Sequence, residues 1–214
     1  TTDGDEIIHN MNMVLKSAES LLHPKTVLRF LQSFNLYSAS RIPKTNSIKR
    51  IKLLPRYPQY EASNQIVERV INGEIRKGLI WHFQGSGKSL LMLYAAKMLK
   101  ADRRLKNPTV IVVVDRVDLD SQINITFDNA DVKNVTPVKS CKELSDELKN
   151  DSRNIIVTTI FKFEDIVIDD QDNKGLNPRR NIIVLVDEAH RTQEGMLAEK
   201  MRWALPNAFF FGLT

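Results

Sequence analysis

From residue 60 onward, short apolar runs alternate with segments that have helical apolar spacing. The runs predicted as strands are 79–81, 109–114, 132–138, 154–159, 181–186 and 208–213. The segments predicted as helices are 60–72, 90–99, 118–127, 140–148 and 195–204. Runs such as 109–114 and 181–186 lack polar alternation, which is typical of strands buried on both faces. Because helices separate the strands, the pattern predicts an α/β fold whose mostly parallel sheet carries helices on both faces.

The first fifty residues follow a different pattern. Two helices are predicted there, 11–22 and 24–34, and Pro24 suits the first turn of the second. Residues 41–55 carry a proline near each end and no sustained period, which indicates an extended connector. We therefore expect a small helical segment over residues 1–50, followed by one domain over residues 51–214.

The charges are distributed unevenly along the chain, whose formal net charge is +5. Between Glu19 and Glu61 there is no acidic residue, and the bases there are Lys25, Arg29, Arg41, Lys44, Lys49, Arg50, Lys52 and Arg56. Such a block is compatible with contact to a nucleic-acid backbone. It is equally typical of a solvated linker.

Composition excludes several classes of protein. Hydrophobic residues make up 42% of the chain and charged residues 27%, as in ordinary globular proteins. No apolar run approaches the roughly 20 residues that cross a bilayer. The single cysteine, Cys141, suits a reducing cytoplasm, and we interpret it as an inert residue. The apolar end 209–214 resembles a buried strand, so we expect the sequence to be part of a longer chain.

The most informative stretch is 79–89, which reads LIWHFQGSGKS. A short apolar strand is followed by a turn made of Gln84, Gly85, Ser86 and Gly87. Glycines let the backbone curl so that several N–H groups point inward, and the positive end of the next helix adds to the attraction for anions. This layout predicts a phosphate-binding loop.

Two residues close this loop, Lys88 and Ser89. In this interpretation Lys88 reaches the β- and γ-phosphates of a nucleotide, and the Ser89 hydroxyl binds Mg²⁺. The strict pattern G-x-x-x-x-G-K-[ST] places a glycine at position 82, where this chain has His82, and Gly85 supplies part of the lost flexibility. The alternative is a chance Gly-Ser-Gly-Lys-Ser turn.

A second signal follows the apolar run 181–186, where the chain reads Asp187-Glu188-Ala189-His190. A carboxylate at this strand end, Asp187, can hold the same Mg²⁺ from the side opposite Ser89. The adjacent Glu188 can orient and deprotonate the attacking water. The alternative is an acidic turn that caps the next helix, and His190 alone is equally a surface histidine.

Asp-Glu-Ala-His after such a loop resembles the superfamily-two helicases and translocases. Further motifs in order are 56–62 (RYPQYEA), 81–89 (WHFQGSGKS), 112–122 (VVVDRVDLDSQ), 157–163 (VTTIFKF) and 211–214 (FGLT). Over about residues 50–214 this set resembles the motor region of the restriction subunit of type I restriction–modification enzymes, and His82 agrees with that family. Residues 20–50 resemble the segment that joins the nuclease domain of that subunit to its motor.

The resemblance implies the first RecA-like P-loop NTPase domain of an ATP- and Mg²⁺-dependent translocase on double-stranded DNA. Its partners would be the modification and specificity subunits of the complex, in the prokaryotic cytoplasm. DNA cleavage would come from a nuclease domain outside this chain. Because the second motor domain would supply a transition-state arginine, we expect this chain alone to bind ATP–Mg²⁺ weakly and to hydrolyse it slowly or not at all.

The resemblance also implies roles by position. Gln59 would hydrogen-bond adenine, although an ordinary polar residue before a helix is an equal alternative. The DNA-contacting residues would be Arg116, Asp118, Gln122, Thr158 and Thr159. His190 would bridge the nucleotide to Thr214 or to a second domain, and Thr214 would link hydrolysis to movement.

Two rival functions remain open at this point. One is an RNA or DNA helicase of the same superfamily. The other is a regulatory domain that senses ATP without mechanical work. The pair Glu147 and Lys149 formally matches a nuclease Glu-x-Lys element, but we interpret it as the solvated face of a capped helix.

Overall fold

The computed structural model describes residues 2–34, 36–41, 48–83, 85–115, 127, 134–150, 152–167, 175–187 and 195–214. Residues 2–10, 38–41 and 48–50 are described by their backbone alone. The predicted helix 118–127 lies outside these ranges except for Phe127. Within the described part of the chain, no helix is long and apolar enough to cross a membrane.

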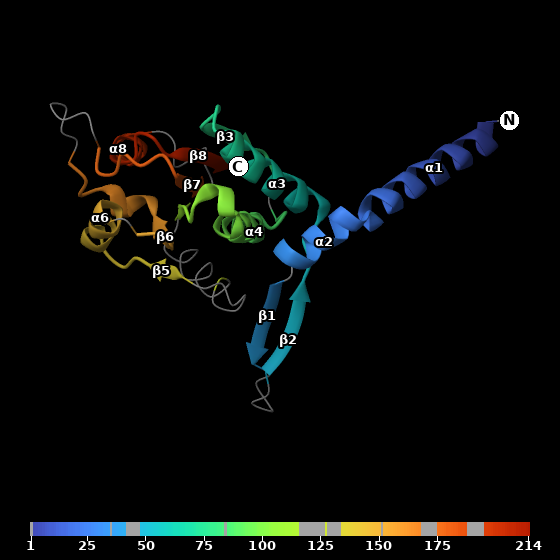
Figure 1. Ribbon diagram of the computed structural model, residues 1–214, viewed down its shortest axis with the longest axis horizontal. Helices are drawn as coiled ribbons and strands as arrows, with labels where there is room; N and C mark the ends of the chain where they lie inside the picture. Colours follow the sequence, from blue (N-terminus) through green and yellow to red (C-terminus); the bar gives the residue numbers. More distant parts are fainter. Residues whose placement is uncertain are drawn as a thin grey trace.

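A parallel sheet forms the centre of the domain (Figure 1). Its strands are β3 (Lys77–Ile80), β4 (Thr109–Val114), β5 (Val135–Pro137), β6 (Ile155–Thr159), β7 (Ile182–Val186) and β8 (Phe209–Leu213). The order across the sheet is β3-β8-β7-β4-β6-β5, and every neighbouring pair is parallel. The predicted α/β fold with a parallel sheet is confirmed, although β5 is shorter than 132–138 and β3 ends before Trp81.

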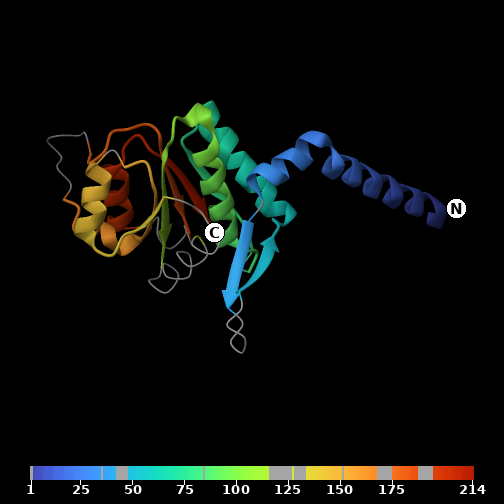
Figure 2. The same cartoon turned by 60° about the horizontal axis from the view of Figure 1, so that its bottom comes forward.

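Helices cover both faces of this sheet, α3 and α4 on one side and α6 and α8 on the other (Figure 2). They are α3 (Tyr57–Asn72), α4 (Lys88–Ala101), α6 (Cys141–Lys149) and α8 (Met196–Ala204), with 3₁₀ turns η1 (Arg103–Leu105) and η2 (Ile160–Phe163). Local sequence explains their ends. Gly73 closes α3 in the left-handed conformation, and the Ser140 hydroxyl accepts a hydrogen bond from the Glu143 N–H at the start of α6.

The continuous apolar strands supply two separate cores. Alternate residues of β4 point to opposite faces, so Val112 packs with α3 and α4 while Val113 packs with α6 and η2. All six residues of β4 are buried. Full burial of an aliphatic side chain contributes about 1.5–3 kcal/mol, which is why a central strand without polar alternation is favoured here.

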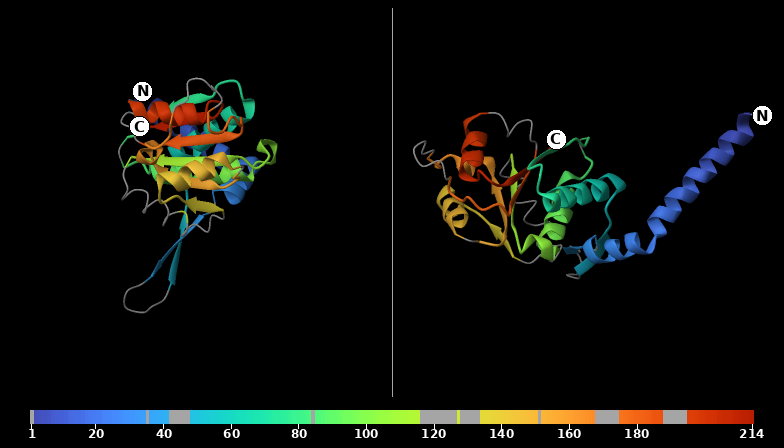
Figure 3. Two further views of the ribbon diagram at one scale, coloured as in Figure 1. Left: turned by 90° about the vertical axis from the view of Figure 1, so that its left-hand side faces the viewer. Right: turned by 45° about the horizontal axis from the view of Figure 1, so that its top comes forward.

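The first fifty residues contain more than helices. α1 (Thr2–Leu22) extends away from the domain, and α2 (Pro24–Ser33) packs beside α4 (Figure 3). β1 (Leu36–Arg41) and β2 (Ile48–Leu53) then pair antiparallel in a separate two-stranded sheet. The prediction of an extended connector over residues 41–55 is therefore wrong in part, because that segment includes the second strand of a hairpin.

An aromatic cluster attaches α2 to the domain. It consists of Phe30, Phe34, Tyr60 and Tyr94. The rings of Phe30 and Tyr60 stack with centroids 4.8 Å apart, and Phe34 is fully buried between them and Tyr94. Burial raises the pKa of Tyr94 to about 12, so its hydroxyl stays protonated at neutral pH.

The parallel sheet has one consequence for function. The carboxyl ends of β3, β4, β6, β7 and β8 lie along a single edge, which we call the carboxyl edge. In open α/β sheets, ligands bind beyond this edge. Apart from the stretch 56–62, which opens α3, the motifs that the sequence singles out lie at the ends of these strands, so the topology brings them to one side of the molecule.

Candidate nucleotide-binding site

The turn after β3 has the backbone geometry of an anion-binding loop. Gly85 and Gly87 both have positive φ, 79° and 83°, which side chains other than glycine rarely adopt. α4 begins directly afterwards at Lys88, and the Leu91 N–H bonds to the Gly87 carbonyl as the first helical hydrogen bond. The N–H groups before Leu91 have no acceptor within the helix, so they can bind anionic oxygens.

Gln59, in the first turn of α3, holds this loop through hydrogen bonds to its carbonyl oxygens. Its amide nitrogen donates to the carbonyl oxygens of Ser86 and Gly87, at 2.9 and 3.1 Å, and its amide oxygen accepts from the Arg56 N–H at 2.8 Å. The side chain is 3% exposed. A Cβ at Gly87 would displace this amide nitrogen, so a side chain there would disturb the contact, and the positive φ of Gly87 independently favours glycine.

This bracing contact was missed in the sequence, where Gln59 was predicted to read adenine. In the structure both ends of the amide are engaged with the protein, and the adenine role stays a prediction. A signal for part of the contact was present. Gln59 stands at the third helical position after Arg56, where a Gln or Glu completes a capping box.

The loop fits a phosphate chain on its outer side. An added Cβ at Gly85 would meet nothing within 4 Å, so the loop borders open space there. The Ser86 hydroxyl oxygen is buried and has no hydrogen-bond partner among the described residues. Open space beside glycines, helix-start N–H groups that have no acceptor within the helix, and the Lys88 ammonium are features that triphosphate binding needs.

His82 occupies the position where the generic pattern has glycine. Its N–H donates to the Thr214 carbonyl at 2.7 Å, and the Thr214 N–H donates to the Ile80 carbonyl at 3.0 Å. Burial, together with the nearby charge of Lys88, lowers the pKa of His82. The imidazole is therefore neutral at pH 7, and it adds no second positive charge beside Lys88.

Asp187 lies at the same edge, directly after β7. Its side chain is 5% exposed, and its N–H donates to the Val113 carbonyl at 2.8 Å. Only β8 separates β7 from β3, which leads into the loop. The sheet order therefore brings Asp187, Thr214 and the loop to neighbouring positions on the carboxyl edge.

The predicted DNA-contacting residues are placed only in part. Thr158 and Thr159 end β6 at the carboxyl edge and are 0% and 1% exposed. Their contact with DNA phosphates stays a prediction, and it requires an exposure that this structure does not show. The other predicted DNA-contacting residues lie outside the described ranges, namely Arg116, Asp118 and Gln122. The same holds for three residues predicted for the nucleotide site, namely Gln84, Glu188 and His190.

Comparison with known proteins identifies the class. The SWI2/SNF2 ATPase family matches residues 58–214, and the chain belongs to this family. Use of ATP follows from that membership.

Two individual relatives are endonuclease subunits of type I restriction enzymes. The chain is 38% identical, over 217 residues, to the type I restriction enzyme HindI endonuclease subunit of Haemophilus influenzae, with 91% of this chain and 20% of that protein covered. It is 28% identical to the type I restriction enzyme SsaAORF53P endonuclease subunit of Staphylococcus saprophyticus, with 99% and 22% covered. The chain thus spans about a fifth of the length of these relatives.

Solved structures support the fold. The UvsW helicase of bacteriophage T4 superposes with a TM-score of 0.54 at 19% identity, over 90% of this chain and 60% of that one. The ATP-dependent Type ISP restriction-modification enzyme LlaBIII, bound to DNA, gives 0.52 at 16% identity, over 82% and 13%. At these identities the likeness shows the RecA-like α/β fold alone.

Proposed function

We propose that this chain is the first motor domain of the restriction subunit of a type I restriction enzyme. In this role it couples ATP hydrolysis to translocation along double-stranded DNA, and a nuclease domain outside this chain then cleaves the DNA. One observation carries the proposal. The braced phosphate loop, Thr214 and Asp187 lie together on the carboxyl edge of a domain that belongs to an ATPase family.

The residues of the site divide the chemistry among them. Lys88 and the N–H groups of the loop would hold the phosphates, and Ser89 and Asp187 would supply oxygen ligands to Mg²⁺. The metal would neutralise charge that develops on the phosphates. Glu188 orients the attacking water and accepts its proton.

Movement requires that the state of the nucleotide reaches other parts of the protein. The backbone bonds between His82, Thr214 and Ile80 join the start of the loop to the end of β8. A displacement of the loop therefore displaces Thr214. His190 extends this link to the nucleotide, and a grip on DNA through Arg116, Asp118, Gln122, Thr158 and Thr159 would follow the same cycle.

The partners follow from the same assignment. Double-stranded DNA is the track, and modification and specificity subunits form the complex in a prokaryotic cytoplasm. The choice of double-stranded DNA is tested by measuring ATP turnover of the full-length protein. Turnover should rise with duplex DNA and stay unchanged with RNA. Stimulation by RNA alone would favour an RNA helicase, and normal ATP affinity without movement on DNA would favour a regulatory domain.

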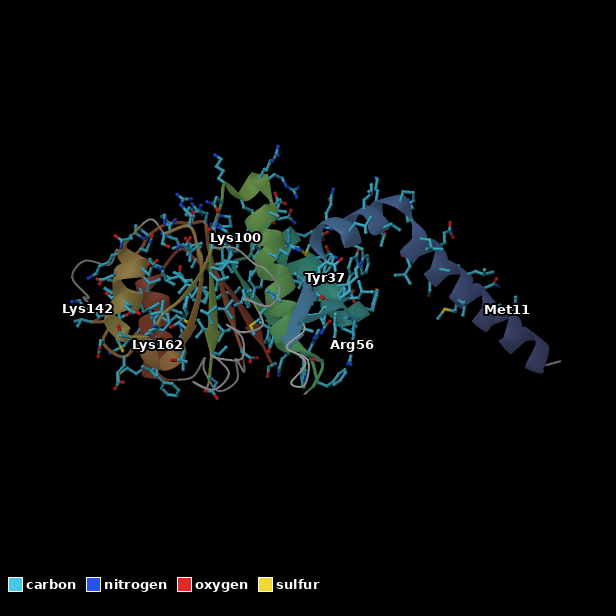
Figure 4. The ribbon with its side chains drawn as sticks, turned by 90° about the horizontal axis from the view of Figure 1, so that it is seen from below. Met11, Tyr37, Arg56, Lys100, Lys142 and Lys162 are labelled. Atoms are coloured by element: carbon cyan, nitrogen blue, oxygen red, sulfur yellow. The ribbon has the colours of Figure 1, made fainter. Side chains whose placement is uncertain are left out.

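The nucleotide site itself is tested by Lys88→Ala. Removal of the ammonium takes away the main positive charge that holds the phosphates, so binding of a fluorescent ATP analogue should be lost while the circular dichroism spectrum is retained. Lys142→Ala is the matched control, because Lys142 is exposed on α6, away from the loop (Figure 4). An unchanged titration of the analogue by Lys88→Ala would remove the phosphate loop from the proposal.

A further inference from the structure

The amino edge of the sheet, opposite the nucleotide site, carries a concentration of positive charge. A groove of about 490 Å³ lies there, which we call the arginine groove. Its basic lining residues are Arg76, Arg104, Lys106, Arg153, Arg179 and Arg180. Among the described residues that line it, none is acidic.

Topology gathers these bases from distant parts of the sequence. Arg76 immediately precedes β3, Lys106 precedes β4, Arg153 precedes β6, and Arg179 and Arg180 precede β7. Because the amino ends of parallel strands meet at one edge, a base placed shortly before four strands produces one cluster. The sequence contains this signal, but each base alone resembles an ordinary loop residue.

Half of the cluster has a structural role. Arg76 donates to the carbonyl oxygens of Arg180 and Asn207, and Arg153 donates to those of Lys106 and Asn107, at 3.2 and 3.3 Å. Arg179 donates to the Thr109 hydroxyl at 2.8 Å. These contacts satisfy oxygens where the strands begin.

The other bases have no such role. Lys106 and Arg180 are exposed, and no hydrogen bond or ion pair joins their side chains to another described residue. Arg104 pairs with Asp102 at 2.6 Å, an exposed contact that offsets one charge of the group. Hydrogen bonding to oxygens at the amino ends of the strands therefore does not explain why Lys106 and Arg180 are basic.

The cations are close enough to affect one another. Burial, and next the charge of Arg180, lowers the pKa of Arg76. Burial, and next the charge of Arg153, lowers the pKa of Lys100, whose ammonium donates to the Pro108 carbonyl at 3.0 Å beside the groove. None of the described residues that line the groove is acidic, although Arg104 pairs with Asp102 outside it, and like charges gathered in this way create a local potential that attracts an anion.

We propose that the arginine groove binds the phosphate backbone of duplex DNA, as a contact separate from the nucleotide edge. The proposal rests on the proposed function, in which the protein moves along DNA. Arginine forms two-pronged hydrogen bonds with phosphate, and it remains charged at every physiological pH. A protein partner fits less well, because charged residues are depleted at the buried core of protein interfaces. None of the large exposed hydrophobic side chains lines this groove.

The dimensions agree with a backbone contact. From β3 to β6 the edge crosses four strand-to-strand spacings, which at about 4.8 Å each give about 19 Å. Successive phosphates of one DNA strand rise about 3.4 Å along the axis, so this length matches between five and six base pairs. Contacts of this kind read charge and not sequence.

The experiment compares this chain with its Lys106→Gln/Arg180→Gln variant. Binding of a labelled duplex of about 30 base pairs is followed by fluorescence anisotropy over a range of NaCl concentrations. Loss of two phosphate contacts should weaken binding by about tenfold or more near 0.1 M salt and reduce the salt slope by about 2. Lys16→Gln/Lys142→Gln removes two exposed charges elsewhere and should leave both quantities unchanged.

Further measurements separate the groove from the nucleotide site. The Lys106/Arg180 variant should bind the fluorescent ATP analogue normally, which also shows that it is folded. Lys88→Ala should retain duplex binding. If the wild-type chain binds the analogue but no duplex, or if the variant binds duplex with unchanged affinity, the groove proposal is overturned while the ATP site stands. If the variant loses binding to poly-L-glutamate but not to duplex, the groove serves an acidic protein surface instead, and the DNA proposal is wrong.

Discussion

Gln59 shows how a single side chain can shape a site without touching the ligand. Its amide nitrogen donates hydrogen bonds to two carbonyl oxygens of the loop, and its amide oxygen accepts one from the Arg56 N–H at the start of α3. The loop is thereby tied to α3, and the N–H groups on its other side stay available for phosphate. Two roles are thus in competition for this residue, bracing of the loop and recognition of adenine.

The variant Gln59→Ala distinguishes these roles. Bracing acts on the phosphate loop, which every nucleoside triphosphate shares, so we expect affinity for ATP and GTP analogues to fall by the same factor, about tenfold. Adenine recognition instead predicts a loss for ATP alone. Parallel titrations of the two fluorescent analogues measure this, and a selective loss of ATP binding would contradict the bracing role.

At the residue scale, spacing in the sequence was enough to find the loop and to expect Asp187 at the same edge. Lys88 follows two glycines, and Asp187 follows an apolar strand, so each position has a local signature. Gln59 differs, because its contact with Gly87 spans 28 positions and depends on how α3 packs against α4. His82 differs for the same reason, since its partner Thr214 follows the neighbouring strand, β8.

At the scale of elements, α2 is a part of the domain more than a linker. Phe34, directly after α2, and Leu36, at the start of β1, are 0% and 1% exposed and belong to the core that α3 and α4 share. By contrast, Leu31 on α2 is 56% exposed. The aromatic cluster therefore carries the attachment, through Phe30 of α2 and through Phe34 at its end.

Truncation of Phe34, at the end of α2, tests the attachment. Phe34→Ala leaves a cavity between α2, α3 and α4, so the free energy of unfolding should fall by about 3–5 kcal/mol. Leu31→Ala, on the exposed face, should change it by less than about 0.5 kcal/mol. Urea denaturation followed by circular dichroism measures both. Equal, small effects would mean that α2 contributes nothing to the stability of the domain.

Elements with strong local patterns were predictable, and the hairpin was not. The sheet strands are apolar runs such as that of β4, and Ser140 marks the start of α6. β1 (LYSASR) and β2 (IKRIKL) mix polar and basic residues, and their pairing with each other is what makes them strands. Such pairing is not visible in the period of either segment alone.

At the scale of the molecule, the structure describes one RecA-like domain of a proposed two-domain motor. An arginine from a second domain commonly raises phosphoryl transfer by about 10³–10⁵. We therefore expect ATP turnover by this chain alone to lie at least about 10³-fold below that of the full-length protein with duplex DNA. A coupled assay for phosphate release measures both. Comparable turnover would show that the domain hydrolyses ATP without a partner.

The two edges of the sheet are connected by one rigid element. α4 has 14 residues, begins at Lys88 in the phosphate loop, and carries Lys100 near its far end (Figure 4). The Lys100 ammonium holds Asn107, Pro108 and Arg153, which form part of the loops around the arginine groove. A helix of this length measures about 21 Å, so a tilt of about 5° at its loop end displaces the other end by about 2 Å. A tilt of α4 on triphosphate binding would therefore shift the cations at the opposite edge of the sheet.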